Sequence, residues 1–525
     1  TATPPTDALE HAICAMLTRA ETNGAPKEFM EQMESLVRGE CRDIFRVQFG
    51  LDPPAKVPPM GVDIKPGSVL MPDRGQRRYS PSQLIAMREE LDALVAHEIY
   101  RKVEDSSSTF ASPVVLTTKP KGGWRVCGDY RKVNAASLTN PYPMPRIDGL
   151  AQNLTESKLY AMFDFIKGYW QTALAEHDQK LFAIVTPDGI YEPSRVVMGA
   201  KNSGAHFQCV VSKPFEHMLY KKLLVYLDDL LAHAKTWQEL LETIRAMFVI
   251  VLELGFKLHP DKCELYAREI AWCGHIVSAK GVSVNPDRVR ALLEMPEPRT
   301  AAELQQFVSA AGWMRNKLKN YAVTAAPLTT LLNECLSGTR RNKAVAAGVV
   351  LSTVGWTPAH AEAFSRMKEM LIHAVTLGHP RDDFEFCPFT DASEVGWGAV
   401  LTQIPHDDLE VPVAEQRHEP LAFLSGVFRG ASKNWAVPDQ EAFPIREACV
   451  RLDYFLYRPL GFHIYTDHRN LKYVFEPSAR KPKSNKPTAR RLERWALELR
   501  SFDYVIEHIP GEDNVWADMM SRWGR

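Results

Sequence analysis

Two adjacent aspartates, Asp228 and Asp229, interrupt the apolar run 223–231, which reads LLVYLDDLL. Carboxylates are rarely buried unless they are paired or bound to a metal. The flanking residues are short and apolar enough to form two strands, and the aspartate pair would then be the turn that joins them. Such a turn can hold a hard divalent cation at a fixed point. A solvated turn explains the pair equally well when it is considered alone.

A third aspartate, Asp164, ends the apolar stretch 160–165, which reads as a buried strand. If this strand is a neighbour of 223–231, two or three carboxylates meet at one edge of a sheet. Mg²⁺ binds through one or two carboxylates together with substrate phosphates. Two such ions can stabilise the attacking and leaving oxygens of an in-line phosphoryl displacement. Considered alone, Asp164 fits better as a structural residue at a strand end.

A second group of carboxylates lies in the last third of the chain. Asp391 follows a predicted strand, Glu441 starts a predicted helix, Asp467 ends a strand and Asp518 lies in the final predicted helix. Each one, taken singly, is more often a surface residue. Because all four stand at element ends of one compact αβ unit, they predict a second two-metal site.

The composition sets wider limits. A chain of 525 residues is too long for one core and predicts several domains. Its hydrophobic content of 45% and charged content of 24% are ordinary for a soluble globular protein, and its net charge of −1 gives no basic signal over the whole chain. Basic residues do gather in one run: Lys472, Arg480, Lys481, Lys483, Lys486, Arg490, Arg491 and Arg494. A solvated loop remains the alternative for this run.

Other sequence features bear on the cellular compartment and on processing of the chain. The nine cysteines are scattered and form no CxxC pair, which favours reduced thiols, an intracellular setting and no zinc site. No apolar run reaches the roughly 18 residues of a membrane span, and the N-terminus has no signal-peptide pattern. Because the chain begins TATPPT without Met, we expect a processed or trimmed product.

The first half of the chain alternates strand and helix patterns. Residues 1–75 are marked by prolines, and we expect them to lie along a larger body. Ser80 and Pro81 open a helix. The segments SPVVLTTKP and WRVCGDY, joined by KGG, predict a hairpin that carries Lys119 and Arg125. Basic groups on a projecting hairpin suit phosphate, although surface solubility is the simpler explanation for them.

The elements around the aspartates predict an α+β sheet domain. After the strand at 160–165 come a hairpin turning at Asp188-Gly189 and a helix over 205–220. The LLVYLDDLL hairpin is followed by a helix over 237–254 that stops at Gly255. A meander of short strands then leads to helices from Pro286 onward, and a second αβ unit begins near Asp383.

Eight motifs in fixed order connect these observations. They are WRVCGDYRKVN, PYPMPRIDGL, FDFIKGYWQ, MGAKNSGAHFQ, YLDDLL, LGFKLHPDKCEL, WCGHIVSAKGV and ELQQFVSAAGWMRN. In this order the chain resembles the reverse transcriptase–RNase H portion of a long-terminal-repeat retrotransposon Pol polyprotein of the Ty3/gypsy class. The resemblance implies a multidomain fold of mixed α+β and α/β class, with a right-hand polymerase and an RNase H-like domain. Its implied parts are an N-terminal extension at 1–76, fingers and palm at 77–285, a thumb at 286–335, a connection at 336–382 and the RNase H domain at 383–525.

The resemblance also assigns roles in the polymerase. Asp164, Asp228 and Asp229 would be its metal-binding carboxylates, with Asp164 and Asp228 as the direct ligands. Lys119 and Arg125 match residues that grip the incoming triphosphate.

Three further residues match substrate contacts of the family. Tyr169 matches an aromatic gate that collides with a ribose 2′-OH, although a core aromatic explains it equally well from spacing alone. Gln208 matches a residue near the template and nucleotide, and Lys257 matches the motif after the palm helix. The chain has Met198-Gly199 where relatives have Phe-Gly, so the contacts there are less defined.

The motifs FTDAS, YTDHRNLKYVF and NVWADMMSR resemble the RNase H of the same family. They imply that the second carboxylate group cleaves RNA in an RNA–DNA hybrid. The enzyme would distinguish the RNA strand from DNA by the 2′-OH of RNA and by the helical shape of the hybrid. Pro444 departs from the family pattern, and we expect it in a first helical turn, where its missing N–H costs nothing. Residues 511–517 contain no histidine, which predicts no histidine-assisted product release. The basic run 472–494 would follow the hybrid's phosphates.

The expected activity is therefore RNA- and DNA-templated DNA synthesis from dNTPs, together with hybrid-specific ribonuclease action. The resemblance implies two Mg²⁺ per site, with Mn²⁺ as an alternative. The implied partners are an RNA template, a DNA primer, an RNA–DNA hybrid and dNTPs, without a membrane; dimerisation is left open. We expect an intracellular, cytoplasmic location within retrotransposon particles, with later nuclear entry left open.

Two other functions were weighed against this one. A domesticated, catalytically silent nucleic-acid-binding protein predicts eroded carboxylates, whereas all seven are present. An RNA polymerase that shares the palm is disfavoured by Tyr169 and by the appended nuclease. Because no D[ST]G protease motif and no zinc-binding integrase pattern occurs, we expect the chain to be a fragment of a longer polyprotein.

Overall fold

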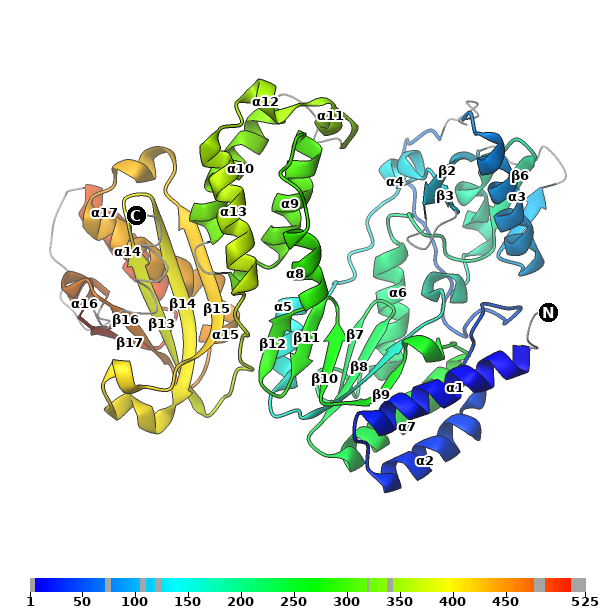
Figure 1. The fold of residues 1–525 in the computed structure, drawn as a ribbon, viewed down its shortest axis with the longest axis horizontal. Helices are drawn as coiled ribbons and strands as arrows, with labels where there is room; N and C mark the ends of the chain where they lie inside the picture. The colour runs from blue at the N-terminus through cyan, green and yellow to red at the C-terminus, as the bar shows by residue number, and fades with distance from the viewer. Residues whose placement is uncertain are drawn as a thin grey trace. The chain divides into compact units, whose positions relative to one another are not determined.

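The computed structural model of the chain describes residues 5–70, 77–103, 110–118, 124–318, 321–337, 343–475 and 487–510. The chain divides into two compact units, Thr1–Cys273 and Gly274–Arg525. Each unit has apolar cores of its own. Figure 1 shows the helices and strands of the chain.

The N-terminal residues share an apolar core with the four-stranded sheet at the centre of unit 1. Helices α1 (Pro5–Thr22) and α2 (Lys27–Arg38) are joined by a short turn. Phe29 of α2 and Phe45, which follows it, are fully buried in the same cluster as Phe163 and Phe248. This part of the chain therefore packs onto a larger body instead of forming a core of its own.

A four-stranded antiparallel sheet lies at the centre of unit 1. Its strands, in spatial order, are β7 (Leu223–Tyr226), β8 (Asp229–Ala234), β4 (Leu159–Asp164) and β9 (Glu264–Ala267). Helix α7 (Trp237–Leu254) packs against β4 and β8. It starts with a capping box formed by Thr236 and Glu239 and ends at Gly255, whose φ of 77° is the left-handed conformation that glycine adopts without strain.

A second sheet in unit 1 has five strands. Their order is β1 (Tyr100–Val103), β6 (Gly189–Pro193), β5 (Ile184–Thr186), β2 (Ser112–Thr118) and β3 (Trp124–Gly128). Helix α3 (Pro81–Ala96) begins after Ser80, as the sequence predicts, and Ser80 forms a capping box with Gln83. Strands β2 and β3 form the expected hairpin, but the turn between them, with Lys119, lies outside the described residues.

Unit 1 also contains several shorter elements. They are α4 (Arg131–Ala136), α5 (Ile147–Leu150), α6 (Ser203–Ser212), β10 (Glu269–Trp272) and the 3₁₀ turns Arg42–Ile44, Ala151–Leu154, Gly168–Gln171, Glu176–Phe182, Lys213–Phe215 and Pro260–Lys262. The helix expected over 205–220 ends at Ser212, because Pro214 has no N–H for a further helical bond. In the expected meander, β9 pairs with β4 and so joins the central sheet.

Unit 2 begins with the hairpin β11 (His275–Ser278) and β12 (Gly281–Val284), followed by helices. The helices are α8 (Pro286–Leu293), α9 (Ala301–Trp313), α10 (Tyr321–Cys335), α11 (Lys343–Gly348), α12 (Leu351–Val354) and α13 (Pro358–Ile372), with a 3₁₀ turn at Arg315–Lys317. One apolar core runs from Val284 to Leu371 and so includes residues of the predicted thumb and connection. The domain bounds themselves stay predictions.

The second αβ region of unit 2 has a five-stranded mixed sheet. Its order is β15 (Glu419–Val427), β14 (Gly396–Pro405), β13 (Phe384–Ala392), β16 (Phe462–Thr466) and β17 (Tyr504–His508). The pairs β13–β16 and β16–β17 are parallel, whereas the other two are antiparallel. Its helices are α14 (Val437–Arg451), α15 (Asp453–Leu456), α16 (Arg469–Phe475) and α17 (Pro487–Leu499), and its 3₁₀ turns are His406–Glu410, Val413–Glu415 and Gly430–Asn434.

Two general features follow from the described residues. All nine cysteines fall within them, and none of the nine forms a disulfide. In the same ranges, no helix is long and apolar enough to cross a membrane.

Candidate active sites

The three carboxylates of the first group meet at one end of the central sheet. Asp164 of β4 and Asp229 of β8 are opposite each other in the antiparallel ladder. The backbone N–H of Phe165 donates to the carbonyl of Asp228 at 3.2 Å. Residues far apart in the sequence therefore converge, as required for a shared cation site.

The hairpin turn differs by one residue from the expected one. Tyr226 pairs with Asp229, so the turn consists of Leu227 and Asp228, and Asp229 already belongs to β8. Leu227 has a φ of 53°, an uncommon conformation for a residue with a side chain. Gln208, a buried residue of α6, holds this turn in place.

The side chain of Gln208 bonds to both sides of the turn. Its Nε2 donates to the carbonyl of Val225 at 3.0 Å and to Ser212 Oγ at 2.8 Å. Its Oε1 accepts from the N–H of Leu227 at 2.7 Å. This placement differs from the expected contact with template or nucleotide, because the whole amide is engaged inside the protein. Gln208 shapes the turn that presents Asp228.

The charges of the first site repel one another. Burial, together with the charges of Asp228 and Asp164, raises the pKa of Asp229 to about 6. Burial also raises the pKa of Asp164, against the opposing hydrogen bond from Lys262. Lys262 Nζ donates to Asp164 Oδ1 at 2.9 Å. Asp164 and Asp229 are partly buried and Asp228 is exposed, and neighbouring carboxylates of this kind fit a hard divalent cation. Among the described residues, the first group does not place three ligand oxygens within 4.8 Å of one another.

Lys262 was missed in the sequence analysis. The available signal was its place in LGFKLHPDKCEL, within the 3₁₀ turn that precedes β9, beside the strand that carries Asp164.

Tyr169 lies beside the first carboxylate group. Its half-buried ring is tilted against Phe207, with the ring centroids 5.2 Å apart. Burial and the charge of Asp228 raise the pKa of the Tyr169 hydroxyl. A Cβ at Gly168 would lie 2.8 Å from Phe207 Cζ and 3.4 Å from Asp228 Cβ. Glycine at position 168 therefore lets the chain carry Tyr169 close to Asp228.

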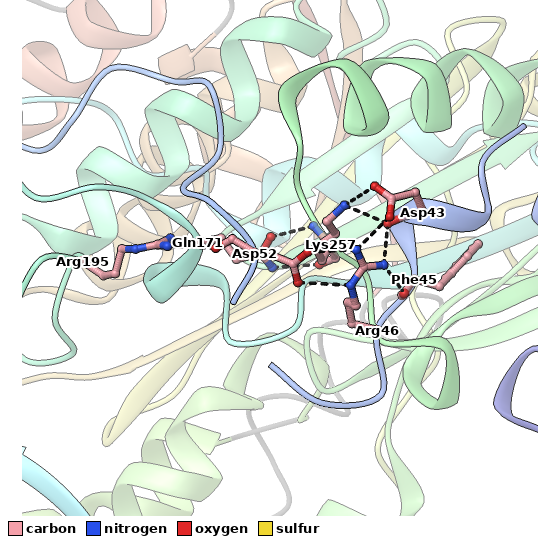
Figure 2. A network of polar contacts seen from close by, with 7 residues as sticks. All are labelled: Asp43, Phe45, Arg46, Asp52, Gln171, Arg195 and Lys257. Atoms are coloured by element: carbon pink, nitrogen blue, oxygen red, sulfur yellow. Dashed lines mark hydrogen bonds and ion pairs between the residues drawn. The ribbon is translucent and has the colours of Figure 1, made fainter. Parts of the chain in front are cut away.

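Of the two remaining predicted substrate contacts, Arg125 is exposed and Lys257 is buried. Arg125 is exposed on β3, opposite Thr117. Lys257 is 6% exposed, and its Nζ donates to Asp43 Oδ2 at 2.6 Å and to the Asp43 carbonyl at 2.8 Å (Figure 2). This differs from the expected nucleotide contact of Lys257, because its ammonium group is bound by the N-terminal segment.

The second carboxylate group converges in unit 2. Asp391 of β13, Glu441 of α14 and Asp467 after β16 each place a ligand oxygen within 4.8 Å of the others. The parallel register of β13 and β16 pairs Thr390 with Thr466 and so brings the following aspartates together. Asp518, the fourth predicted member, lies outside the described residues.

The electrostatics of the second group also fit a divalent cation. Burial, followed by the charges of Asp391 and Asp467, raises the pKa of Glu441 to about 8. Asp391 itself is 6% exposed. Three acidic oxygens held this close in a partly buried site need a positive charge to remain ionised together.

The expected position of Pro444 in its helix was wrong. Helix α14 begins at Val437, with Pro438 in its first turn, so Glu441 and Pro444 lie further inside it. Pro444 cannot donate to the carbonyl of Gln440, yet the helix continues to Arg451 and still presents Glu441.

The basic run 472–494 is described only in part. Arg490 and Arg494 are exposed. Arg491 Nη1 donates to Asp439 Oδ2 at 2.5 Å, and its guanidinium lies 4.5 Å from the Trp435 ring centroid. At least one residue of the run thus stabilises the fold, whereas residues 476–486 lie outside the described ranges.

Two family models match separate parts of the chain. Residues 117–277 match reverse transcriptase (RNA-dependent DNA polymerase), and residues 382–502 match the RNase H-like domain found in reverse transcriptase. Asp164, Asp228 and Asp229 lie within the first match, and Asp391, Glu441 and Asp467 lie within the second. One part of the chain therefore matches a reverse transcriptase domain, and a later part matches an RNase H-like domain.

Curated relatives are transposon polyproteins. The Retrovirus-related Pol polyprotein from transposon 412 of Drosophila melanogaster is 30% identical over 451 residues, which cover 85% of this chain and 34% of that protein. The Tf2-3 polyprotein of Schizosaccharomyces pombe is 27% identical over 443 residues, covering 84% and 31%. The chain spans about a third of the length of these relatives. Its relationship to Pol polyproteins of Ty3/gypsy-type transposons, inferred from the motifs, is confirmed.

Solved structures share the fold. The foamy viral protease–reverse transcriptase in complex with dsDNA has a TM-score of 0.78 at 19% identity, covering 97% of this chain and 98% of that one. The same protein in complex with an RNA/DNA hybrid has a TM-score of 0.75 at 20% identity, covering 97% and 64%. At this identity the likeness establishes the fold, and the expected fold class is confirmed.

Proposed function

We propose that this chain is a reverse transcriptase that copies RNA and DNA templates into DNA from dNTPs and also cleaves RNA in RNA–DNA hybrids. The observation that carries the proposal is the convergence of two separate carboxylate groups, one in each matched domain. Retention of all seven predicted carboxylates argues against a catalytically silent binding protein.

In the polymerase site, Asp164, Asp228 and Asp229 would hold two Mg²⁺ ions, with Mn²⁺ as the alternative. Bound divalent ions neutralise charge on the attacking and leaving oxygens of phosphoryl transfer. The protein's own contribution is to fix these carboxylates at the end of β4 and in the hairpin turn held by Gln208. Positioning of this kind is the main demand of phosphoryl transfer on a protein.

Selection of deoxynucleotides would depend on Tyr169. Its ring packs on Phe207 and lies close enough to Asp228 for the carboxylate charge to act on its hydroxyl. A nucleotide bound at the carboxylates would meet this ring with its sugar. We infer that a ribose 2′-OH collides with the ring, so that dNTPs are preferred over NTPs.

In the RNase H site, Asp391, Glu441 and Asp467 would hold two divalent ions, with Asp518 as the fourth carboxylate. The raised pKa of Glu441 favours the protonated carboxyl until a cation binds. The 2′-OH and the shape of the hybrid would distinguish the RNA strand from DNA. The complexes of the foamy viral protein with dsDNA and with an RNA/DNA hybrid support nucleic acids of both kinds as partners.

The direct test is primer extension on an RNA template, with dNTPs and NTPs in parallel, and cleavage of a labelled RNA–DNA hybrid by the same preparation. The proposal predicts extension with dNTPs, little extension with NTPs, and hybrid cleavage, all dependent on a divalent cation. A protein that binds the primer–template but neither extends it nor cleaves the hybrid would contradict the proposal. Efficient extension with NTPs would indicate an RNA polymerase instead.

A further inference from the structure

A polar network joins the N-terminal segment 43–52 to Lys257, which in turn bonds to Gln171 (Figure 2). Arg46 is at its centre. Its Nη2 donates to Asp43 Oδ1 and to Asp52 Oδ1, each at 2.8 Å, and its Nε donates to Asp52 Oδ2 at 3.1 Å. Asp43 in turn accepts from Lys257 Nζ. This segment precedes residues 117–277, which match the reverse transcriptase family model.

The N-terminal segment 43–52 is also joined through its backbone, by way of Leu258, to the strand region that carries Asp164. Leu258 forms a parallel bridge with Phe45 and an antiparallel bridge with Phe165. The N–H of Leu258 donates to the carbonyl of Ile44 at 2.7 Å, and the N–H of His259 donates to the carbonyl of Asp164 at 3.0 Å. Residues 44–46 are thus two extended segments away from Asp164, with Leu258 between them.

Gln171 forms hydrogen bonds to the segment that follows Asp164 and to the segment that contains Lys257. Its Nε2 donates to the carbonyls of Ile166 at 2.7 Å and Lys257 at 2.8 Å, and its Oε1 accepts from the N–H of Lys257 at 2.6 Å. Gln171 is 3% exposed, so these bonds are shielded from water. They hold the backbone that follows Asp164 against the backbone of Lys257. None of these bonds involves the Lys257 side chain.

The buried charge of Lys257 needs a partner, which the N-terminal segment 43–52 supplies. An ammonium group that is almost fully buried is costly unless it has a partner of opposite charge. Burial would raise the pKa of Asp43, but hydrogen bonds from Lys257 and Arg46 outweigh it and lower that pKa. Asp43 therefore stays ionised at neutral pH and supplies the partner. The same loop, five residues further on, brings Lys262 to the Asp164 carboxylate.

We propose that the Asp43–Lys257 ion pair, supported by Arg46, positions the loop 257–262 and with it the carboxylate of Asp164 for DNA synthesis. The inference rests on the proposed polymerase function and extends its site to residues outside the matched family region. Asp43 acts through Lys257 and the loop, so it is a positioning residue and touches no substrate. Without its charge, the buried ammonium draws the loop toward solvent and displaces the groups that contact Asp164.

The test compares steady-state extension by the full chain with Asp43→Asn, Asp43→Glu and the control Glu40→Gln, which changes an exposed carboxylate three positions before Asp43. We expect Asp43→Asn to lower kcat by about ten- to a hundredfold, the scale of a small misplacement of reacting groups. KM for dNTP should stay within about twofold, because no substrate contact is lost. Asp43→Glu should recover most of kcat, and Glu40→Gln should behave as wild type.

Two further measurements separate positioning from loss of folded protein. Hybrid cleavage by the same samples should be unchanged in all variants, because its carboxylates lie in unit 2. The variant Lys257→Met removes the buried charge, so that adding Asp43→Asn to it should cost no further extension activity. If Asp43→Asn proves too unstable to assay alone, this pair of variants still gives the answer.

The inference is overturned if Asp43→Asn extends primers at the wild-type rate. It is also overturned if extension and cleavage fall together, or if the two substitutions reduce extension independently. Absence of extension in the wild-type chain would instead overturn the proposed polymerase function, and this inference with it.

Discussion

Asp164 and Asp229 face each other as the last pair of the β4–β8 ladder, with Asp228 one residue away in the adjoining turn. An antiparallel register with side-chain period two puts directly opposite residues on the same face. The two carboxylates therefore share one face by construction of the sheet. A slip of one residue would separate them, so the elements that fix this register and the turn are as important as the acids.

Gln208 is one such element, and replacing it should impair polymerization selectively. Gln208→Leu removes three hydrogen bonds around the turn and leaves the N–H of Leu227 without the Oε1 acceptor. Loss of a buried hydrogen-bond partner costs about 1–3 kcal/mol. We expect a lower unfolding midpoint and at least about a tenfold loss of extension, the scale of a 1.4 kcal/mol effect on the barrier.

Gln179→Leu is a suitable control for Gln208→Leu, because Gln179 is half-buried and makes a single 3.3 Å bond to the Leu174 carbonyl. Extension equal in the two variants would show that Gln208 does not shape the site.

Gly168→Ala tests the close packing beneath Tyr169. The added methyl would lie 2.8 Å from Phe207 Cζ, so the aromatic ring must move. Overpacking of this kind costs about 1–3 kcal/mol, and the displaced ring is the one on which Tyr169 packs. We expect reduced thermal stability and reduced extension, measured by calorimetry and primer extension.

The matched control for this variant is Gly149→Ala, because a Cβ at Gly149 meets no atom of the described residues within 4 Å. Equal stability of the two alanine variants would contradict the packing argument.

Tyr169 should set the preference for deoxynucleotides through its bulk. Tyr169→Ala should raise the ratio of NTP to dNTP incorporation by about tenfold or more, the scale expected when a contact of 1–3 kcal/mol is lost. Tyr169→Phe keeps the ring on Phe207 and should keep the wild-type ratio. The measurement is kcat/KM for each nucleotide on one template. An unchanged ratio in Tyr169→Ala would mean that another residue is the gate.

Glu441 gives the metal-free protein a specific pH dependence. Its pKa is about 8 in the folded state, against 4.5 as the ordinary value. A carboxyl group whose pKa is raised by folding contributes stability that is complete below about pH 4.5 and is lost as the pH rises through 8. In EDTA, the unfolding midpoint should therefore fall between pH 5 and 8, and fall less in Glu441→Gln.

Added Mg²⁺ should reverse this loss at pH 8 in the wild-type protein, because a cation that binds only the folded state stabilises it. Identical pH profiles for wild type and Glu441→Gln, measured calorimetrically, would show that the repulsion among Asp391, Glu441 and Asp467 is insignificant.

Local signals in the sequence were enough to predict much of the fold. Ser80 and Gly255 mark helix ends that the structure confirms, since capping depends on a few neighbouring residues. Asp164, Asp391 and Glu441 stand in strands or helices that the apolar pattern identifies. The left-handed conformation of Leu227 could not be predicted, because a leucine gives no local reason to adopt it.

The sequence was less informative about residues that work inside the protein. Motif resemblance places Gln208 and Lys257 near a substrate, but it does not say which way a side chain points. Gln208 turns inward to the hairpin, and Lys257 turns to Asp43, more than 200 positions away. Pro444 was misplaced because Pro438 opens the helix one turn earlier than the family motif indicates.

The central claim is that two independent carboxylate sites perform two reactions, and single substitutions that keep the shape of the side chain test it most directly. Asp228→Asn and Asp467→Asn should be assayed side by side for primer extension and for hybrid cleavage. We expect Asp228→Asn to abolish extension and retain cleavage, whereas Asp467→Asn should retain extension and abolish cleavage. Extension that survives Asp228→Asn would contradict the assignment of the polymerase site.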